Sequence, residues 1–563
     1  MEQFILSVLF VQILCALGAL IPLIILWWLE RWLSAIALVL ILIVTCFGFS
    51  FLPALFRELY GFEWFRNVIR TIAKNYPYLV QNSDVMASWS AFVAGAIFAW
   101  VILVFSFVMR SPSRILRGSE LLPESEMVRK LRSAGRAKIA PGLGQYYLPS
   151  KLENRSMAIF GEPGSGKTQL ILGFLHSIRH RSDRVVSMDV GGEICKKLAM
   201  RGDQILSVNV EGSQQWSPFS EIENLIECAA LASALISSGV GEARTWNGYA
   251  RELLTVFLSE CWRTNQRTNR ELNYYIKIAS TDELRVLVHG TSAQRLFEAG
   301  NERMLGNVQS ILSQNLSFLD LLDPDAGEDA FSLRRWIQNH RSGGWLWIVY
   351  DDLTKLATAQ LRAAWIEILA RSALGLPESS TRNVRLILDE LAANGKIDVL
   401  MDALARGRKY GLSLMLGIQN IHQLYSIYGK DEALSILGSA GLNVILRTPD
   451  PETSDYLSRT IGDAESVREQ TTTNSQGSSS IQKLQETKRT VLPSEISSLP
   501  DLVGFIKFAD IGWGRLRIPL IRLKNRLSLT IKQNSINGSD IHKPSKLNLD
   551  NAQPLASSVL DEI

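Results

Sequence analysis

Cysteine is scarce in this sequence, and its spacing shows no chemical pattern. Five cysteines are scattered over 563 residues, no two of them have the spacing of a metal-ligand pair, and two lie in apolar runs. This scatter excludes the disulfide framework that staples small secreted domains. We therefore expect reduced thiols that face the cytosol at Cys15, Cys46, Cys195, Cys228 and Cys261.

A strong excess of charge of either sign is also absent. Lys and Arg total 59 and Asp and Glu total 55, so the net charge is +4 and the pI is near 8.7. This mildly basic balance permits a nucleic-acid partner without arguing for one. No internal repeat is present, and the chain is too long for one ordinary core, so two or three domains are expected.

Long apolar runs are present, and all of them lie near the N-terminus. Residues 4–29, 33–56 and 89–109 are nearly free of charge. Each run has the ~20 apolar residues that cross a hydrocarbon layer about 30 Å thick. Tryptophans that suit the interfacial aromatic belt stand at the run ends, at Trp27, Trp28, Trp32 and Trp89.

These runs predict a membrane domain over residues 1–110. One such run could be a buried core helix, but three within 110 residues disfavour that reading. A cleavable signal peptide fits less well, because the start is not basic and no small-residue cleavage site follows.

The charges that follow the third run predict the orientation. Seven basic residues stand there, at Arg110, Arg114, Arg117, Arg129, Lys130, Arg132 and Arg136. Basic flanks favour the inside of the membrane, which places the rest of the chain in the cytosol. Three spans would put Met1 and segment 57–88 outside, yet residues 4–56 could form a re-entrant hairpin, or one run could lie in the interface. The number of spans stays open.

A glycine-rich motif of the form GxxxxGK[ST] is the most informative feature of the sequence. An apolar strand is expected before it at 157–160 and a helix after it at 169–175. In that setting the glycines let successive backbone N–H groups face a phosphate, and the helix N-terminus adds partial positive charge. The flanking elements disfavour a chance glycine-rich turn. The predicted nucleotide-binding residues are Gly161, Glu162, Pro163, Gly164, Ser165, Gly166, Lys167, Thr168 and Gln169.

Two of these residues have specific roles in such a motif. Lys167 is expected to reach the β- and γ-phosphates, and Thr168 is expected to hold Mg²⁺. The sequence thus predicts a protein that binds a nucleoside triphosphate.

The remainder of the chain divides by its apolar periodicity. Residues 111–223 read as the first part of an α/β domain with a strand at 184–189, and residues 341–527 read as its second part. Four further strands are expected in that second part, at 345–350, 384–388, 412–416 and 443–446. Between the two parts, residues 224–340 show helical spacing, which predicts an all-α insertion.

Two segments have the composition of unfolded chain. Residues 465–488 are rich in Ser, Thr, Gln and charge, and they predict a mobile loop. Residues 528–563 are rich in Asn, Ser and Lys, and they predict a disordered tail.

Two pairs of acidic residues compete for the metal side of the site. A P-loop site needs an acid at the end of a neighbouring strand to hold Mg²⁺, and a following carboxylate can polarise the attacking water. Asp389 and Glu390 suit these two roles, because the longer Glu reaches over the nucleotide. Asp351 and Asp352 also end a strand, and we favour a helix N-cap there.

Two further polar positions are candidates for catalysis. Gln419 ends the next strand, where an amide can sense the γ-phosphate, although it could equally be an ordinary strand-end amide. Arg406, Arg408 and Lys409 form a cationic cluster on the preceding helix. One arginine could act in trans in an adjacent subunit's site, or the cluster could be a solvated basic helix end.

Several stretches together resemble the type IV coupling proteins, the TraD-like ATPases of conjugation and type IV secretion. The resemblance spans roughly residues 110–525. It is carried by Arg117-Gly118-Ser119, the P-loop, the turn Trp216-Ser217-Pro218-Phe219-Ser220-Glu221, the stretch from Leu388 to Asn420, and Val491-Leu492-Pro493-Ser494-Glu495-Ile496.

The resemblance implies a RecA/FtsK-like P-loop fold and a homohexameric ring in the bacterial inner membrane that uses ATP and Mg²⁺. It implies DNA, a relaxase and a type IV secretion channel as partners, besides membrane lipid. It also implies a finger arginine at Arg408 and a sensor glutamine at Gln419, and an insertion that meets the relaxase complex.

One departure from the family pattern concerns the turn after the second strand. The family usually has a DPKGE-type turn, whereas this chain has Asp189-Val190-Gly191-Gly192-Glu193. The acidic ends remain, so Asp189 and Glu193 are expected to shape the nucleotide pocket. The lysine is missing, and no role can be carried over from it.

The favoured hypothesis is a membrane-anchored ATPase that drives DNA with attached protein toward a secretion channel. Lys167, Glu390, Arg408 and Gln419 would be its catalytic residues, and Thr168 and Asp389 its metal ligands. One alternative is an FtsK-like chromosome translocase, which the lack of a long linker and of an evident C-terminal winged-helix module disfavours. The other is a docking receptor in which ATP only drives assembly.

Overall fold

The structure is a computed structural model that describes residues 114–135, 139–339, 344–473 and 479–531, together with the single positions 67, 70 and 74. The predicted membrane runs 4–29, 33–56 and 89–109 lie outside the described residues. Within the described part, no helix combines the length and the apolar character that a membrane crossing needs. Cys195, Cys228 and Cys261 are buried free thiols, whereas Cys15 and Cys46 are outside the described residues.

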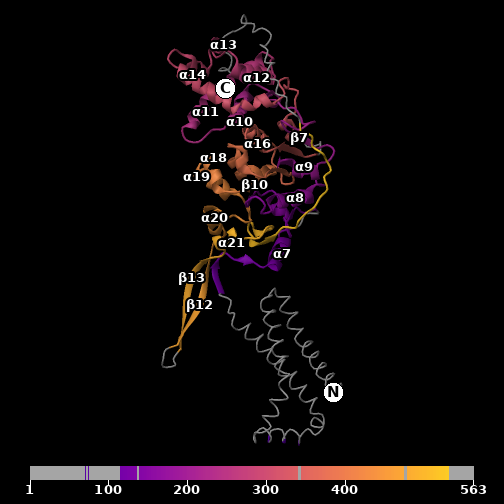
Figure 1. Cartoon of the computed structure of the whole chain (residues 1–563), viewed down its shortest axis with the longest axis vertical. Helices are drawn as coiled ribbons and strands as arrows, with labels where there is room; N and C mark the ends of the chain where they lie inside the picture. The colour runs from indigo at the N-terminus through magenta and orange to yellow at the C-terminus, as the bar shows by residue number, and fades with distance from the viewer. Residues whose placement is uncertain are drawn as a thin grey trace, which may run out of the picture. The chain divides into compact units, whose positions relative to one another are not determined.

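A ten-stranded mixed sheet forms the centre of the described chain (Figure 1). Seven neighbouring strands, from β11 to β7, run parallel, and β14 and β15 extend the sheet by antiparallel pairing. All six strands expected from the sequence are present. In spatial order the strands are β2 (Leu121–Leu122), β15 (Gly512–Arg517), β14 (Val503–Phe508), β11 (Leu442–Ile445), β5 (Met157–Phe160), β10 (Leu412–Ile418), β9 (Val384–Leu388), β6 (Arg184–Val190), β8 (Leu346–Tyr350) and β7 (Gln204–Leu206).

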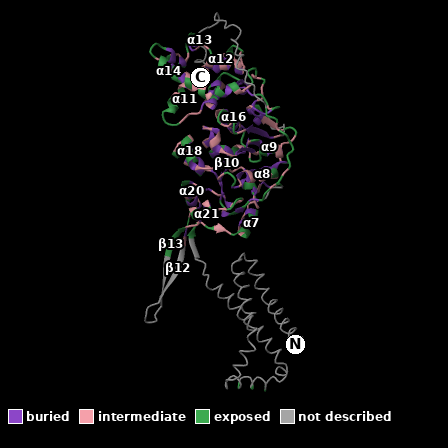
Figure 2. Cartoon of the chain, in the orientation of Figure 1, coloured by how far each residue is buried: buried purple, intermediate pink, exposed green. Residues whose placement is uncertain are grey.

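Helices cover both faces of the sheet, so its central strands are buried on both sides (Figure 2). In β5, for example, Met157 and Ile159 join one core, whereas Ala158 and Phe160 join the other. This burial explains why these strands are continuous apolar runs rather than alternating ones. One core includes α7 (Glu124–Ser133), α8 (Lys167–Ile178) and α9 (Glu193–Leu198), and the other includes α16 (Ala359–Leu374), α17 (Leu400–Arg406), α18 (Ile421–Tyr428), α19 (Lys430–Ser439), α20 (Pro451–Ile461) and α21 (Pro493–Ser497).

The segment between β7 and β8 is helical, as its spacing predicts, and it forms an insertion in the sheet domain. Its long helix α11 packs on α14, and α10 packs on α16 of the sheet domain. Apolar residues of the insertion such as Leu253, Phe257 and Leu312 belong to the same continuous core as the sheet. The helices are α10 (Ile226–Leu235), α11 (Ala243–Arg263), α12 (Asn269–Lys277), α13 (Thr281–Leu287), α14 (Glu302–Asn315) and α15 (Leu333–Gln338).

The prediction of a mobile loop at 465–488 is wrong for residues 465–473 and 479–488, and residues 474–478 lie outside the described part. Two strands, β12 (Asp463–Thr473) and β13 (Ser479–Arg489), pair there, and β1 (Arg114–Gly118) extends them to a three-stranded sheet. The sequence of these strands, rich in Ser, Thr and Gln, shows no apolar alternation. Their Thr residues are nonetheless compatible with backbone pairing.

An extended segment, residues 518–531, follows β15 and runs along the α8 and α9 side of the sheet. The N–H of Ile521 donates to Gln169 Oε1 (3.3 Å), and the N–H of Arg526 donates to the Lys196 carbonyl (2.7 Å). The Glu211 N–H donates to the Thr530 carbonyl (2.9 Å). The first residues of the predicted tail, 528–531, are therefore held on the domain, and residues 532–563 lie outside the described part.

Candidate functional site

The P-loop lies between β5 and α8, as its sequence context predicts. The N–H of Gly161 donates to the Ile418 carbonyl at the end of β10 (3.0 Å), and the N–H of Glu162 donates to the Arg447 carbonyl (2.9 Å). The loop is thus held by the strands on both sides of β5. Gly166 adopts φ +115°, and a Cβ there would stand 2.9 Å from Leu502 Cδ2, so glycine is required at this position.

Lys167 is buried at the first position of α8 and points back into the loop. Its Nζ donates to the carbonyls of Gly161 (2.6 Å) and Glu162 (3.1 Å). Burial lowers the pKa of Lys167, and the nearby carboxylates of Asp389, Glu390 and Glu162 oppose that shift. The loop therefore keeps a cation in place where phosphate oxygens are expected.

Asp389 stands beside Thr168, although 221 positions separate them in the chain. Thr168 Oγ1 donates to Asp389 Oδ2 at 3.1 Å. Strand β9 is not paired with β5, because β10 lies between them. The carbonyl of Asp389 passes so close to Gly417 of β10 that a Cβ at 417 would stand 1.8 Å from it.

Asp389 has the features of a residue that holds a cation. Its Oδ1 is buried and has no hydrogen-bond partner within the described residues. Burial raises the pKa of Asp389, whereas Lys167 and the hydroxyl of Thr168 lower it. A hydroxyl and a carboxylate with one free oxygen are the donors that Mg²⁺ uses in P-loop sites, so these residues fit that ion.

Glu390 and Gln419 complete a single pocket with the P-loop. Glu390 Oε2 accepts from Lys355 Nζ at 2.7 Å. Gln419 is half-buried at the end of β10. The pocket has a volume of about 450 Å³ and is lined by Glu162, Pro163, Gly164, Gly166, Lys167, Thr168, Gln169, Val190, Asp389, Glu390, Gln419, Asp501, Leu502 and Leu520. Gly161 and Ser165 do not line this pocket. Both form hydrogen bonds within the loop: the Gly161 carbonyl accepts from Lys167 Nζ, and Ser165 Oγ donates to the Glu162 carbonyl (2.7 Å).

Arg408 lies away from this pocket. It is exposed in the 3₁₀ helix Gly407–Tyr410, which directly precedes β10. The P-loop and Gln419 lie at the opposite, carboxyl end of that strand. The seven residues of β10 at about 3.3 Å each separate the two ends by roughly 20 Å. Arg408 therefore cannot reach the pocket of its own chain. Arg406 is paired with Asp402 on α17.

The second acidic pair, at the end of β8, has a structural role. Strand β6 separates β8 from β9. Asp351 Oδ1 accepts from the N–H (2.8 Å) and Oγ1 (2.7 Å) of Thr354, and Oδ2 accepts from Asn209 Nδ2 (2.7 Å). Asp351 therefore caps the turn that follows the strand, and not a helix as the sequence suggested, since α16 begins later at Ala359.

Asp189 and Glu193 do not line the nucleotide pocket. The Asp189 carboxylate accepts from the backbone N–H groups of Ile194 (3.3 Å) and Cys195 (2.6 Å), at the start of α9. Burial raises the pKa of Asp189 to about 7, against the effect of these two hydrogen bonds. The pocket residue supplied by this turn is Val190.

Sequence reasoning missed several residues around the pocket. Arg447 follows β11, forms an ion pair with Glu162 of the P-loop, and contacts Asp501 at 2.7 Å. Its position after a strand next to β5 was the available signal. Leu502 and Leu520 come from the distant C-terminal part of the chain, and no local pattern marks them.

The Trp216–Glu221 turn connects the insertion to the sheet domain. The buried Glu221 carboxylate accepts from Trp216 Nε1 (2.9 Å), Ser332 Oγ (3.0 Å) and the N–H groups of Leu333 and Arg334 at the start of α15 (2.8 and 3.0 Å). This one side chain joins the entry of the insertion to its last helix.

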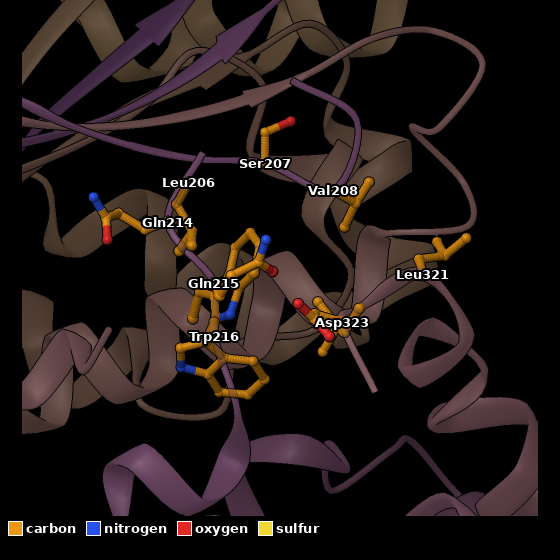
Figure 3. Close-up of a pocket in the computed structure, with 10 residues that line it drawn as sticks. Leu206, Ser207, Val208, Gln214, Gln215, Trp216, Leu321 and Asp323 are labelled. Atoms are coloured by element: carbon orange, nitrogen blue, oxygen red, sulfur yellow. The ribbon is translucent and has the colours of Figure 1, made fainter. Parts of the chain in front are cut away.

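A second pocket of about 250 Å³ lies beside this turn, and none of the predicted site residues lines it (Figure 3). Trp216 and Trp365 meet there edge to face, with ring centroids 5.9 Å apart. Its lining residues are Leu206, Ser207, Val208, Gln214, Gln215, Trp216, Leu321, Leu322, Asp323 and Trp365.

Together, the parallel sheet, the P-loop and the acidic end of β9 define a P-loop nucleotide-binding protein with a helical insertion. Residues 142–519 match the family model described as the type IV secretion-system coupling protein DNA-binding domain. This match covers more than half of the chain, and the chain belongs to the family of type IV secretion coupling proteins.

Relatives and solved structures agree with this assignment. Coupling protein TraD of Escherichia coli strain K12 is 25% identical over 447 residues, which is 74% of this chain and 61% of TraD. The chain thus spans about three fifths of that relative. The solved structure of the bacterial conjugative coupling protein TrwBdeltaN70 is 30% identical, with a TM-score of 0.67, and the match covers 74% of this chain and 96% of the other. TrwB in complex with ADP and Mg²⁺ is 29% identical with a TM-score of 0.67, over 74% of this chain and 98% of that one.

Proposed function

We propose that this protein is a membrane-anchored ATPase that couples a relaxase–DNA complex to a type IV secretion channel and drives DNA transfer in conjugation. The observation that carries the proposal is the contact between Thr168 of the P-loop and Asp389 of β9, with Lys167 and Glu390 in the same pocket. Family membership and the solved TrwB complexes with a non-hydrolysable ATP analogue and with ADP and Mg²⁺ support it.

Hydrolysis would follow from the positions of these side chains. Lys167 would leave the two carbonyls it contacts and bind the β- and γ-phosphates. Thr168 and Asp389 would hold Mg²⁺, which when bound neutralises charge on the phosphate oxygens. Glu390 would take a proton from a water molecule whose oxygen attacks the γ-phosphorus, and ADP would leave with the electron pair of the broken P–O bond.

The position of Arg408 suits a role in the nucleotide site of a neighbouring subunit. Because Arg408 lies at the opposite end of β10 from its own pocket, it would neutralise the transition state in an adjacent protomer. Gln419 would sense the γ-phosphate within the same protomer. This division of the site requires a ring, and we propose a homohexamer.

The membrane anchor and the DNA contact complete the proposal. The three apolar runs before residue 110 would hold the chain in the bacterial inner membrane, with the nucleotide domain in the cytosol. DNA would be gripped mainly through backbone charge, so its affinity should fall steeply as salt rises. The helical insertion would meet the relaxase complex.

The experiment uses the full-length protein in lipid nanodiscs and compares Lys167→Ala and Glu390→Gln with wild type. If each variant abolishes DNA-stimulated ATP turnover while relaxase docking persists, the motor function is supported. If DNA leaves the ATPase rate of wild type unchanged and Lys167→Ala abolishes docking, the protein is a docking receptor in which ATP drives assembly only.

A further inference from the structure

The carboxylate of Glu390 forms an ion pair with a lysine from a neighbouring turn. Lys355, on the turn that follows β8, places its Nζ 2.7 Å from Glu390 Oε2. The Lys355 and Glu390 side chains are 29% and 18% exposed, so the pair is partly screened by solvent. Glu390 lines the nucleotide pocket, whereas Lys355 does not line the pocket and contacts Glu390 from outside it. The Glu390 carboxylate can thus face either the ammonium group of Lys355 or a water molecule in the nucleotide pocket.

The backbone of Glu390 is fixed, which leaves its side chain as the part that can move. The Glu390 carbonyl accepts from Asn394 Nδ2 (2.8 Å), and Asn394 Oδ1 accepts from Arg362 Nε (2.9 Å). Asn394 and Arg362 are both fully buried. The backbone carbonyl of Glu390 is therefore anchored in the core.

The same buried arginine also anchors the turn that carries Lys355. Arg362 donates to Thr358 Oγ1, and Thr358 Oγ1 in turn donates to the Thr354 carbonyl (2.7 Å). Arg362 also donates to the Ala393 carbonyl (2.6 Å), one residue before Asn394. The segments that carry the two partners of the ion pair are thus linked by hydrogen bonds to the same buried arginine.

The ion pair between Lys355 and Glu390 is weak enough to open and close reversibly. An ion pair with this exposure contributes on the order of 0.2–1 kcal/mol, which is about a 1.4- to fivefold equilibrium. A general base that is hydrogen-bonded to an ammonium group must release it before it can accept a proton from water. An ion pair of this strength would lower the turnover rate without abolishing it.

We propose that Lys355 is a positioning residue that holds Glu390 in a resting orientation, and that this ion pair opens before Glu390 activates water. The proposal rests on the proposed ATPase function of the same pocket. Lys355 acts only through Glu390, and it takes no part in binding the nucleotide.

The test is steady-state ATP turnover by the full-length protein in nanodiscs, without DNA. Lys355→Met is expected to raise kcat about two- to fivefold with an unchanged KM for ATP. Lys355→Arg, which keeps the ion pair, is expected to behave as wild type. The double variant Lys355→Met with Glu390→Gln is expected to be as slow as Glu390→Gln alone. A fall in kcat for Lys355→Met, or no change in it, would overturn the proposal.

A matched control removes an ion pair of similar length far from the pocket. Lys277 Nζ contacts Asp320 Oδ2 at 2.5 Å in the helical insertion, and Lys277→Met is expected to leave kcat unchanged. If Lys277→Met raises kcat as much as Lys355→Met does, the effect is not specific and the proposal is wrong.

A second measurement needs no hydrolysis. Acylation of lysine amines, followed by mass spectrometry, is expected to label Lys355 faster in Glu390→Gln than in wild type, because the free amine is then available. Equal labelling in the two proteins would contradict the ion pair. If instead Lys167→Ala keeps its turnover, the proposed ATPase site fails, and the labelling still decides whether Lys355 is held by Glu390.

Discussion

Strands β8 and β9 each end in two consecutive acidic residues, Asp351 and Asp352 after β8 and Asp389 and Glu390 after β9. Both strands are fully buried, and both pair in parallel with β6, which lies between them. Only the β9 end reaches the P-loop, because one strand lies between β9 and β5 whereas three strands lie between β8 and β5. Strand order, which no local pattern shows, separates a candidate metal ligand from a turn cap.

The largest expected difference between the two strand ends is in ATP turnover. Glu390→Gln removes the proposed proton acceptor and is expected to lower kcat by about 10²- to 10⁴-fold. Asp352, at the corresponding position after β8, is exposed, and Asp352→Asn is expected to leave kcat unchanged. Saturating MgATP turnover with DNA measures both. A comparable loss in Asp352→Asn would remove the distinction between the two ends.

Metal dependence should separate the first acid of each pair. Asp389→Asn is expected to weaken binding of an ATP analogue in the presence of Mg²⁺ by about 10- to 100-fold, since it alters a proposed metal contact. Without Mg²⁺ the variant and wild type should bind alike. Fluorescence titration of a labelled analogue measures this, with Asp351→Asn as the matched control. Weakening that persists without Mg²⁺ would point to a disturbed fold rather than a lost ligand.

Strand β6, which lies between β8 and β9, carries the buried Asp189, whose protonation can be tested by the pH dependence of stability. The pKa of Asp189 is raised by burial to about 7, so the folded state holds this proton more tightly than the unfolded state. Asp189 therefore contributes to the free energy of unfolding at low pH, where it is protonated, and this contribution is lost as the pH rises toward about 7.

The corresponding experiment follows the melting temperatures of wild type and Asp189→Asn. With each pKa unit worth about 1.4 kcal/mol and the pKa raised from 3.8 to about 7, the stability of wild type relative to the variant should fall by about 3–4 kcal/mol between roughly pH 4 and pH 7.5. The lost hydrogen bond from Ile194 adds a difference that does not vary with pH. A gap that stays constant over this range would show that Asp189 is not protonated in the fold.

The smallest effect is expected at the turn cap. Asp351→Ala removes the acceptor for Thr354 and Asn209 and is expected to cost about 1–2 kcal/mol of stability. Its kcat per folded molecule should match that of wild type. Denaturation and turnover are measured on the same preparation. A loss of turnover without a loss of stability would assign Asp351 to the nucleotide site after all.

The sequence was sufficient for the elements whose burial leaves a strong apolar signature. The strands at 157–160 and 384–388 are continuous apolar runs because helices cover both of their faces. The glycine pattern of 161–168 could be placed between a strand and a helix for the same reason. From these two features the closeness of the P-loop to the acidic end of β9, seen in the contact between Thr168 and Asp389, could be anticipated.

Other features left no local trace. Strands β12 and β13 are rich in Ser, Thr and Gln, so the segment 463–489 has the composition of a loop although its backbone pairs. Asp189 could not be identified as the cap of α9 from the sequence, because an acid after a strand suits a pocket equally well. The contact between Lys355 and Glu390 joins residues 35 positions apart, on the segments that follow β8 and β9, and only the strand order brings them together.

The most direct measurement is the position of Mn²⁺, bound in place of Mg²⁺ with a non-hydrolysable ATP analogue, determined by anomalous diffraction. A single metal peak is expected beside Thr168 Oγ1, with the Asp389 carboxylate near enough to hold it directly or through one water, within about 5 Å. A peak beside Asp351, or one that lies out of reach of Asp389, would show that the end of β9 is not the acidic half of the nucleotide site.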